Sequence, residues 1–335
     1  MSINSIIVSM KKFGLYLSFF MIIFLYGCKF NTPSTIHMYD GYYFNTYVSV
    51  SLYGCGSEEV AKNAVELCGY YEKIFSRTNE TSLLYQLNNE GKIKTDSVEA
   101  EILSEILKYG REYYDITDGA LNIALEPVTS LWDFSSGASI VPKKERIAEA
   151  LDNTDCSLIE ITENGIELNG VSVDLGAVAK GFAADRIKEY LVDEGVDSAI
   201  INLGGNILCI GDKPTGEDFV IGIQKPFSNE TLLGLEINGR SVVTSGTYER
   251  YFRKDGVLYH HILDPDTGMP CDNNLLSVTI VAESGVLCDC LSTGCFVMGM
   301  EEAMELINNM ENVYAIFVDD DYNVYYSEGA DVFVK

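Results

Sequence analysis

The sequence is poor in basic residues. Its 335 residues include 23 Lys and Arg against 50 Asp and Glu, so the formal net charge at pH 7 is −27. Such a charge repels phosphate backbones, which excludes nucleic acids as general partners. An anionic small molecule needs a local cation to bind such a chain, and a divalent metal ion would serve.

Several common sequence motifs are also absent. No Cys-x-x-Cys pair exists, which argues against a zinc or redox site of that type. No GxGxxG or P-loop pattern occurs, so the Rossmann and Walker nucleotide sites are excluded. There is no long Pro- or Ser-rich linker, so any two halves of the chain share a tight interface. The hydrophobic content of 47% nevertheless predicts a folded globular protein.

The longest apolar run lies near the N-terminus and predicts export. Two lysines precede an apolar stretch over residues 13–26, which ends in Gly27-Cys28. This order of charged and apolar residues is typical of a secretory signal. The apolar run is shorter than the about 20 residues that a membrane-spanning helix needs, so a permanent span is less favoured. The segment Leu-Tyr-Gly-Cys resembles a bacterial lipobox and predicts lipidation of Cys28, with an uncleaved anchor as the alternative. We expect a lipoprotein signal peptide over 1–28, a polar tether over 29–40 and a folded domain over 41–335.

Eight cysteines follow Cys28, and we interpret most of them as buried small apolar side chains. Disulfides are the alternative in an exported protein, but a domain of about 300 residues does not need them for stability. The eight are Cys55, Cys68, Cys156, Cys209, Cys271, Cys288, Cys290 and Cys295.

Strand and helix patterns are interleaved without a strict βαβ rhythm. Alternation over 42–52 predicts a strand, and Ser57 followed by two glutamates predicts the start of an amphipathic helix. We predict further helices over 98–114 and 143–151, and short strands over 158–161, 165–168, 171–175 and 277–282. This order predicts an α+β fold with mixed sheets and packed helices.

Two adjacent histidines precede a turn. His260 and His261 lead into the segment 264–268, in which Pro fixes φ and Gly permits positive φ. A histidine with an ordinary pKa of about 6.5 on such a corner could act as a general base, although an isolated histidine is more often structural. Adjacent strand residues face opposite sides, so only one of the two can point into a given pocket.

Small and acidic residues mark a strand-to-helix turn over 173–185. Asp174 and Gly176 end the apolar strand, and Lys180 lies near the helix start. A helix N-terminus at a sheet end attracts anionic ligands, but the same residues would also make a tightly packed turn. Further turns suited to close approach of a ligand follow apolar runs at Gly204-Gly205 and Thr244-Ser245-Gly246.

Asp289 and Thr293 lie four residues apart on a predicted helix start. Their oxygens would share one face of the helix and could hold a hard cation such as Mg²⁺. The alternative is an N-terminal cap followed by a threonine that bonds back to the helix.

Taken in order, these segments resemble the ApbE family of bacterial flavin transferases. The resemblance runs from about Tyr42 to Met298 and beyond. It rests on eight ordered elements, which are Ser76-Arg77 with Leu84, Leu87 and Asn88; Thr117–Ala120 with Pro127, Leu131 and Trp132; Asp174-Leu175-Gly176 with Lys180, Gly181 and Asp185; Asn202–Gly205 with Ile207; Ile223–Pro226; Thr244-Ser245-Gly246; His261–Gly268; and Ser277-Val278-Thr279 with Asp289 and Thr293.

The resemblance implies a T-fold-like α+β architecture with the flavin nucleotide in a cleft between two halves. It implies a metal-dependent transferase that splits FAD, moves FMN onto a Ser or Thr of an acceptor protein and releases AMP. In family terms His261 is the general base, and Asp289, Thr293 and the Ala177 carbonyl bind Mg²⁺. The implied nucleotide-binding residues are Asp174, Lys180, Gly204, Gly205, Thr244, Ser245 and Gly246.

One departure from the family keeps the reaction's outcome open. Many members have an aromatic residue where this chain has Thr78, and such a ring would stack on the flavin or adenine. Without it, water could be the usual acceptor, so hydrolysis of FAD to FMN and AMP is one alternative. A flavin-binding lipoprotein without chemistry is another. For the transferase, we expect an extracytoplasmic enzyme, lipid-anchored to the bacterial membrane, with a basic, exported or membrane-attached acceptor protein.

Overall fold

The described part of the chain begins with a hairpin of two strands, where the alternating pattern predicts one strand. The computed structural model describes residues 35–134, 137 and 139–335. Strand β1 spans Ile36–Tyr43 and pairs antiparallel with β2, which spans Thr46–Tyr53. Two residues with positive φ, Phe44 and Asn45, make the turn between them. The strand predicted over 42–52 is confirmed from Thr46 onward as β2, but the turn places residues 42 and 43 in β1.

The same hairpin corrects the predicted tether. Residues 36–40, which were expected in the tether over 29–40, pair with β2 instead. The predicted signal peptide over 1–28, with Cys28, lies outside the described residues and stays a prediction. Among the helices that are described, none is long and apolar enough to cross a membrane.

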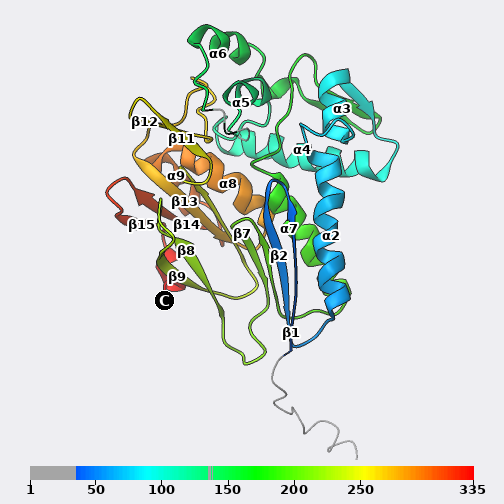
Figure 1. Ribbon diagram of the computed structural model, residues 1–335, viewed down its shortest axis with the longest axis vertical. Helices are drawn as coiled ribbons and strands as arrows, with labels where there is room; N and C mark the ends of the chain where they lie inside the picture. Colours follow the sequence, from blue (N-terminus) through cyan, green and yellow to red (C-terminus); the bar gives the residue numbers. More distant parts are fainter. Residues whose placement is uncertain (1–34, 135–136, 138) are drawn as a thin grey trace, which may run out of the picture. The chain divides into compact units, whose positions relative to one another are not determined.

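An eight-stranded sheet runs through the compact unit Ile36–Lys335 (Figure 1). Its strand order is β1-β2-β6-β7-β10-β13-β14-β15, and every neighbouring pair is antiparallel. Beyond the first hairpin the strands are β6 (Ala199–Leu203), β7 (Asn206–Ile210), β10 (Ser241–Gly246), β13 (Leu275–Ala282), β14 (Tyr314–Asp319) and β15 (Val324–Tyr326).

Smaller sheets and the helices surround this sheet. The short strands are β3 (Lys92–Lys94), β4 (Glu160–Thr162), β5 (Gly165–Glu167), β8 (Phe219–Gln224), β9 (Thr231–Ile237), β11 (Tyr251–Lys254) and β12 (Val257–His260). The helices are α2 (Glu58–Phe75), α3 (Leu83–Glu90), α4 (Val98–Ile116), α5 (Glu126–Trp132), α6 (Lys144–Leu151), α7 (Ala179–Asp193), α8 (Gly285–Met298) and α9 (Met300–Asn308), with 3₁₀ turns over Cys156–Leu158 and Ala330–Phe333.

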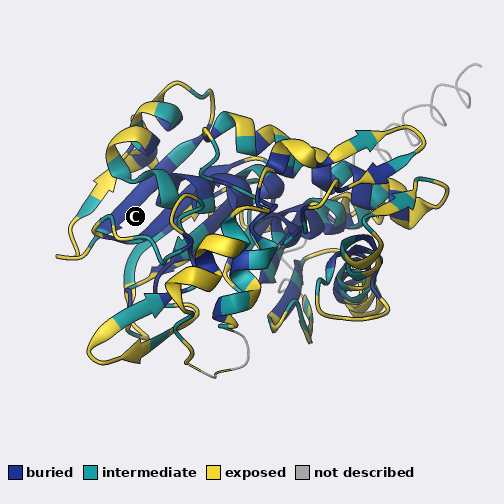
Figure 2. Ribbon diagram, turned by 90° about the horizontal axis from the view of Figure 1, so that it is seen from above, coloured by how far each residue is buried: buried dark blue, intermediate teal, exposed yellow. Residues whose placement is uncertain are grey.

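The central strands bury both of their faces. Val243 of β10 and Ile280 of β13 join the main core with residues of α2, α7 and α8. Their neighbours Val242 and Val281 join a second core, with residues of the β8–β9 hairpin. Successive strand residues point to opposite faces, which explains this division. Figure 2 shows the buried residues gathered in the sheet and on the inner sides of the helices.

A third core holds the turn that follows the two histidines. The indole N–H of Trp132, at the end of α5, donates to the carbonyl oxygen of Gly268 at 2.8 Å. The ring of Trp132 also packs against Tyr259 of β12, with 5.6 Å between ring centroids. Helix α5 and the turn over 264–268 are thereby held together, and this fixes the backbone just beyond His261.

The α+β prediction is confirmed, and the helices predicted over 98–114 and 143–151 correspond to α4 and α6. The strand predicted over 171–175 is wrong, since only Ser172 makes an isolated bridge there. Val173 bonds instead to the side chain of Asn88, through its N–H at 2.8 Å and its carbonyl at 2.9 Å. The segment is extended because a side chain, and no neighbouring strand, satisfies its backbone.

The cysteine interpretation is also confirmed. All eight cysteines after Cys28 are free thiols, and all of them except Cys55 and Cys271 are buried. Burial raises the pKa of the Cys295 thiol to about 12, so this group is neutral and unreactive at neutral pH.

Candidate functional site

A cleft of about 420 Å³ gathers residues from distant parts of the chain. Its size falls within the usual range for small-molecule sites. Its walls come from the β1–β2 turn, the loop after α2, the turn before α7, the end of β10, the segment after β12 and helix α8. Of the predicted residues, those lining it are Asp174, Ala177, Lys180, Gly204, Thr244, Ser245, Gly246, His261, Asp289 and Thr293.

Gly205 is the predicted site residue that does not line the cleft. Its φ is +91°, and its N–H donates to the side-chain oxygen of Asn202 at 3.0 Å. Only glycine adopts such a conformation without strain. Gly205 therefore shapes the β6–β7 turn, while Gly204 forms part of the cleft wall.

Asp289 is a buried carboxylate held at the base of the cleft. Its side chain is 4% exposed, and its Oδ2 accepts the backbone N–H of Gly181 at 2.8 Å. Its Oδ1 lies 3.6 Å from the ammonium of Lys180. The alternative of an N-terminal cap is wrong, because Ser284 caps α8 by accepting the N–H of Leu287. Asp289 lies in the second turn of α8 with its carboxylate facing the start of α7.

Close packing of α7 against α8 depends on Gly181. A Cβ there would clash with the carbonyl oxygen of Gly285 and lie 2.6 Å from the Cβ of Asp289. We predict that Gly181→Ala lowers the free energy of unfolding by about 1–3 kcal/mol, the usual cost of overpacking. Gly222→Ala is a suitable control, because a Cβ there meets a side-chain methyl of Thr231 at 3.2 Å. Chemical denaturation measures both, and equal stability of the two variants would contradict the packing argument.

Hydroxyl groups from two elements meet beside Asp289. Ser245 at the end of β10 lies 2.9 Å from the Ser292 hydroxyl and 3.1 Å from the Thr293 hydroxyl of α8. Ser292 bonds back to the Asp289 carbonyl at 3.0 Å, so the back-bonded residue is Ser292 and not Thr293. Asp289 and Thr293 share one face of α8, as their spacing predicts.

The predicted magnesium ligands are a chemically suitable set. The Asp289 carboxylate, the Thr293 hydroxyl and the Ala177 carbonyl would all offer oxygen, the donor that Mg²⁺ prefers. Nowhere in the described ranges do three His, Cys, Asp or Glu residues form a cluster able to hold a metal. A site with one carboxylate suits a Mg²⁺ that keeps several waters or shares substrate phosphates, and does not suit an all-protein cage.

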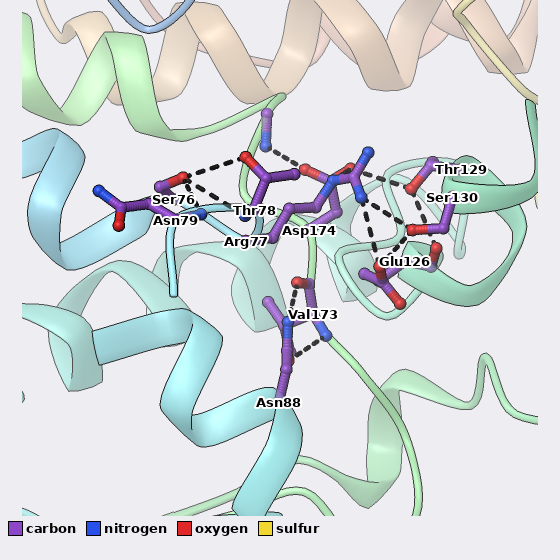
Figure 3. Close-up of polar contacts among 11 residues, drawn as sticks. Ser76, Arg77, Thr78, Asn79, Asn88, Glu126, Thr129, Ser130, Val173 and Asp174 are labelled. Carbon is purple, nitrogen blue, oxygen red and sulfur yellow. Dashed lines mark hydrogen bonds and ion pairs between the residues drawn. The ribbon is translucent and has the colours of Figure 1, made fainter. Parts of the chain in front are cut away.

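Asp174 anchors the wall of the cleft through an arginine (Figure 3). Its Oδ2 lies 2.9 Å from Nε of Arg77 and accepts the Thr129 hydroxyl at 3.0 Å. Its Oδ1 accepts the N–H of Gly176 at 2.9 Å. Arg77 also contacts Glu126 at 3.3 Å, so its positive charge is already offset by two carboxylates. Asp174 lines the cleft as predicted, but its oxygens hold protein groups in place.

The two histidines face different surroundings, as their adjacency predicts. His260 is buried, its Nε2 lies 3.1 Å from the Cys271 carbonyl, and its ring packs edge-on against Phe296. His261 lines the cleft, while its Nδ1 is buried without a hydrogen-bond partner in the described part of the chain. Its backbone N–H donates to the Arg250 carbonyl at 3.0 Å. His260 is therefore structural, and His261 is available to a ligand.

The pKa of His261 departs from the sequence-based expectation. Burial lowers it to about 3, and the charge of Arg250 adds to the effect, with smaller contributions from His260 and Lys180. The expected ordinary pKa near 6.5 is wrong, because a charged imidazolium is disfavoured beside fixed cations in a confined cleft. His261 is therefore neutral at physiological pH.

This pKa gives a testable pH dependence. The unfolded histidine titrates at about 6.5 and the folded one at about 3, so between these values the unfolded chain binds the extra proton. The contribution of His261 to stability is therefore present above about pH 6.5 and falls as the pH drops toward 3. We expect the imidazole NMR resonances of His261, assigned by His261→Asn, to stay constant between about pH 5 and pH 8. A midpoint near neutrality would contradict the assigned environment.

Glu249 and Arg250 are among the cleft residues that were missed from the sequence. Burial raises the pKa of Glu249, the cations of Lys180 and Arg250 lower it, and Asp289 raises it further. Both residues lie within four positions of the predicted turn at 244–246. Charged residues next to a turn expected to approach a ligand were the available indication.

The fold and the cleft together define an enzyme-like domain in which a carboxylate, a hydroxyl and a neutral imidazole converge in one polar cleft. The sequence profile of the ApbE family matches residues 44–317. The chain therefore belongs to the ApbE family.

Individual relatives extend over most of the chain. It is 33% identical over 299 residues to an FAD:protein FMN transferase of Klebsiella pneumoniae, covering 86% of this chain and 90% of the relative. It is 33% identical over 279 residues to an FAD:protein FMN transferase of Treponema pallidum, covering 77% and 76%. The crystal structure of the ApbE protein of Thermotoga maritima superposes with a TM-score of 0.82 at 29% identity, covering 90% of this chain and all of that one. The implied fold class is confirmed.

Proposed function

We propose that this protein transfers FMN from FAD to a Ser or Thr hydroxyl of an acceptor protein and releases AMP. The observation that carries the proposal is the convergence of His261, Asp289 and Thr293 in one cleft of a chain that belongs to the ApbE family. Relatives that bear the name FAD:protein FMN transferase match over most of the chain's length.

The reaction needs one proton acceptor and neutralisation of a diphosphate. The acceptor hydroxyl attacks the phosphorus on the FMN side, a new P–O bond forms, and the anhydride bond to AMP breaks. The hydroxyl proton passes to His261, which is neutral in the free cleft; the negative charge of the bound diphosphate would favour the imidazolium and so make the imidazole a stronger base. AMP leaves with the bridging oxygen. Phosphoryl transfer depends mainly on positioning and charge neutralisation, so this machinery is sufficient.

Magnesium is part of the proposal. Asp289, Thr293 and the Ala177 carbonyl would hold it, and when bound it would neutralise charge on the diphosphate. We predict that EDTA reduces AMP release from FAD by at least about 100-fold, a typical value for loss of one electrostatic stabiliser. Adding back Mg²⁺ in excess is expected to restore the rate. Full activity in EDTA after dialysis would contradict the metal assignment.

Hydrolysis of FAD by water remains the competing outcome, because Thr78 lines the cleft where many family members have an aromatic ring. The mature chain is incubated with FAD and Mg²⁺, with and without an exported protein fraction as acceptor. Covalent flavin fluorescence on a protein band is expected for transfer. AMP release at the same rate without acceptor would indicate hydrolysis, and intact FAD would indicate binding alone.

We also propose that the protein is exported and lipid-anchored through Cys28. The support is the order of charged, apolar and lipobox-like residues ahead of the folded domain. In cell fractionation we expect the full chain in the membrane fraction and Cys28→Ser depleted from it. An equal distribution of the two would contradict lipidation.

A further inference from the structure

Three cations line the cleft within the described residues, and two of them are already paired. Arg77 is held by Asp174 and Glu126, and Lys180 lies 3.6 Å from Asp289 and 3.4 Å from the Gly176 carbonyl. The third is Arg250, whose guanidinium makes no hydrogen bond or ion pair with any residue that the structure describes, although Glu249 lies within electrostatic range of it. An unpaired guanidinium in a cleft is available to an anionic ligand.

The backbone places this arginine next to the base. The Arg250 carbonyl accepts the His261 N–H at 3.0 Å, so the two residues lie across from each other at the open end of the β11–β12 hairpin. The charge of Arg250 also contributes to the lowered pKa of His261, so the guanidinium and the imidazole lie within electrostatic range. Both residues also line the same cleft, so a ligand phosphate held there can contact the guanidinium as well as the imidazole.

The negative charge of a bound diphosphate requires a cationic side chain in the cleft. A diphosphate carries negative charge into a protein whose net charge is −27, and the other cleft cations are offset by carboxylates. A guanidinium presents a planar fork of donors that matches phosphate oxygens, and it stays charged at all working pH values. Glu249 interacts electrostatically with both Arg250 and Lys180, but burial raises its pKa, which weakens it as a permanent counter-charge.

We propose that Arg250 binds the diphosphate of FAD beside His261, and that it stabilises charge on the phosphorus under attack. The inference rests on the proposed function and adds a substrate-binding residue to it. Arg250 thereby complements the group at Asp289, which lies on a different element of the cleft.

The test compares ligands that differ in their phosphates. Dissociation constants are measured for FAD and for riboflavin, which lacks the phosphates and is measured by competition with FAD. The proteins compared are full-length wild type, Arg250→Gln and Arg250→Lys. We expect Arg250→Gln to weaken FAD binding about 10- to 100-fold and to change riboflavin binding less than about twofold. The FAD affinity of Arg250→Lys is expected to lie between those of wild type and Arg250→Gln, because an ammonium keeps the positive charge but lacks the planar fork of donors.

A neighbouring arginine provides the matched control. The guanidinium of Arg253 lies 6.0 Å from the ring centroid of Phe227 and does not line the cleft, so Arg253→Gln is expected to bind both ligands as wild type does. Thermal unfolding shows whether each variant is folded. If Arg250→Gln does not fold, the FAD affinity of Arg250→Lys tests the inference instead. Wild-type affinity of the Arg250 variants for FAD, or equal losses for FAD and riboflavin, would overturn the inference. A wild-type chain that does not bind FAD would overturn the proposed function itself.

Discussion

Asp289→Ala is expected to reduce AMP release from FAD by at least about 100-fold, as metal removal does, while the protein stays folded. The variant removes the carboxylate proposed to hold Mg²⁺ and leaves the ammonium of Lys180 without its partner. It also leaves the Gly181 N–H without its acceptor, which costs about 1–3 kcal/mol of stability. Asp289→Asn keeps an acceptor oxygen for that N–H and should lose activity with a smaller loss of stability.

The control for Asp289 is a second acidic residue close to the same helix. Glu283 precedes α8, is exposed and does not line the cleft, so Glu283→Gln is expected to leave turnover and metal dependence unchanged. Steady-state AMP release over a Mg²⁺ titration measures all three variants. A folded Asp289→Asn enzyme with wild-type turnover and the same Mg²⁺ dependence would remove this carboxylate from the site.

His261→Ala is expected to slow FMN transfer about 100- to 10,000-fold, the range typical of a general base. FAD binding should change much less, because the imidazole is neutral and contributes no charge to the diphosphate. The measurement is the single-turnover rate of AMP formation alongside the FAD dissociation constant. His37→Ala is the control, since this histidine lies on edge strand β1, away from the cleft. An unchanged single-turnover rate would exclude a role for His261 as base.

Local sequence patterns predicted the chemical groups better than their surroundings. The spacing of Asp289 and Thr293 correctly predicted that both lie on one helix face. The adjacency of the two histidines correctly predicted that only one of them lines the cleft. The helix start was misplaced because Ser284 caps α8 a full turn before Asp289. The short polar side chain that caps a helix was less apparent in the sequence than the acidic residue that follows.

Long-range contacts account for what the sequence could not predict. The segment over 171–175 resembles a strand, but Asn88 of α3 satisfies its backbone. Whether a cation is free depends on partners far away in the chain: Arg77 finds Asp174, and Arg250 finds none among the described residues. The lowered pKa of His261 likewise arises from burial in the folded cleft and from Arg250. Such properties appear only once the chain is folded.

The most direct test of the account is mass spectrometry of exported proteins after incubation with the purified enzyme, FAD and Mg²⁺. The account predicts a Ser or Thr peptide that carries one added FMN, with AMP released in equal amount, and no such peptide with His261→Ala. AMP release without any modified hydroxyl, or a modified peptide formed equally well by His261→Ala, would contradict it.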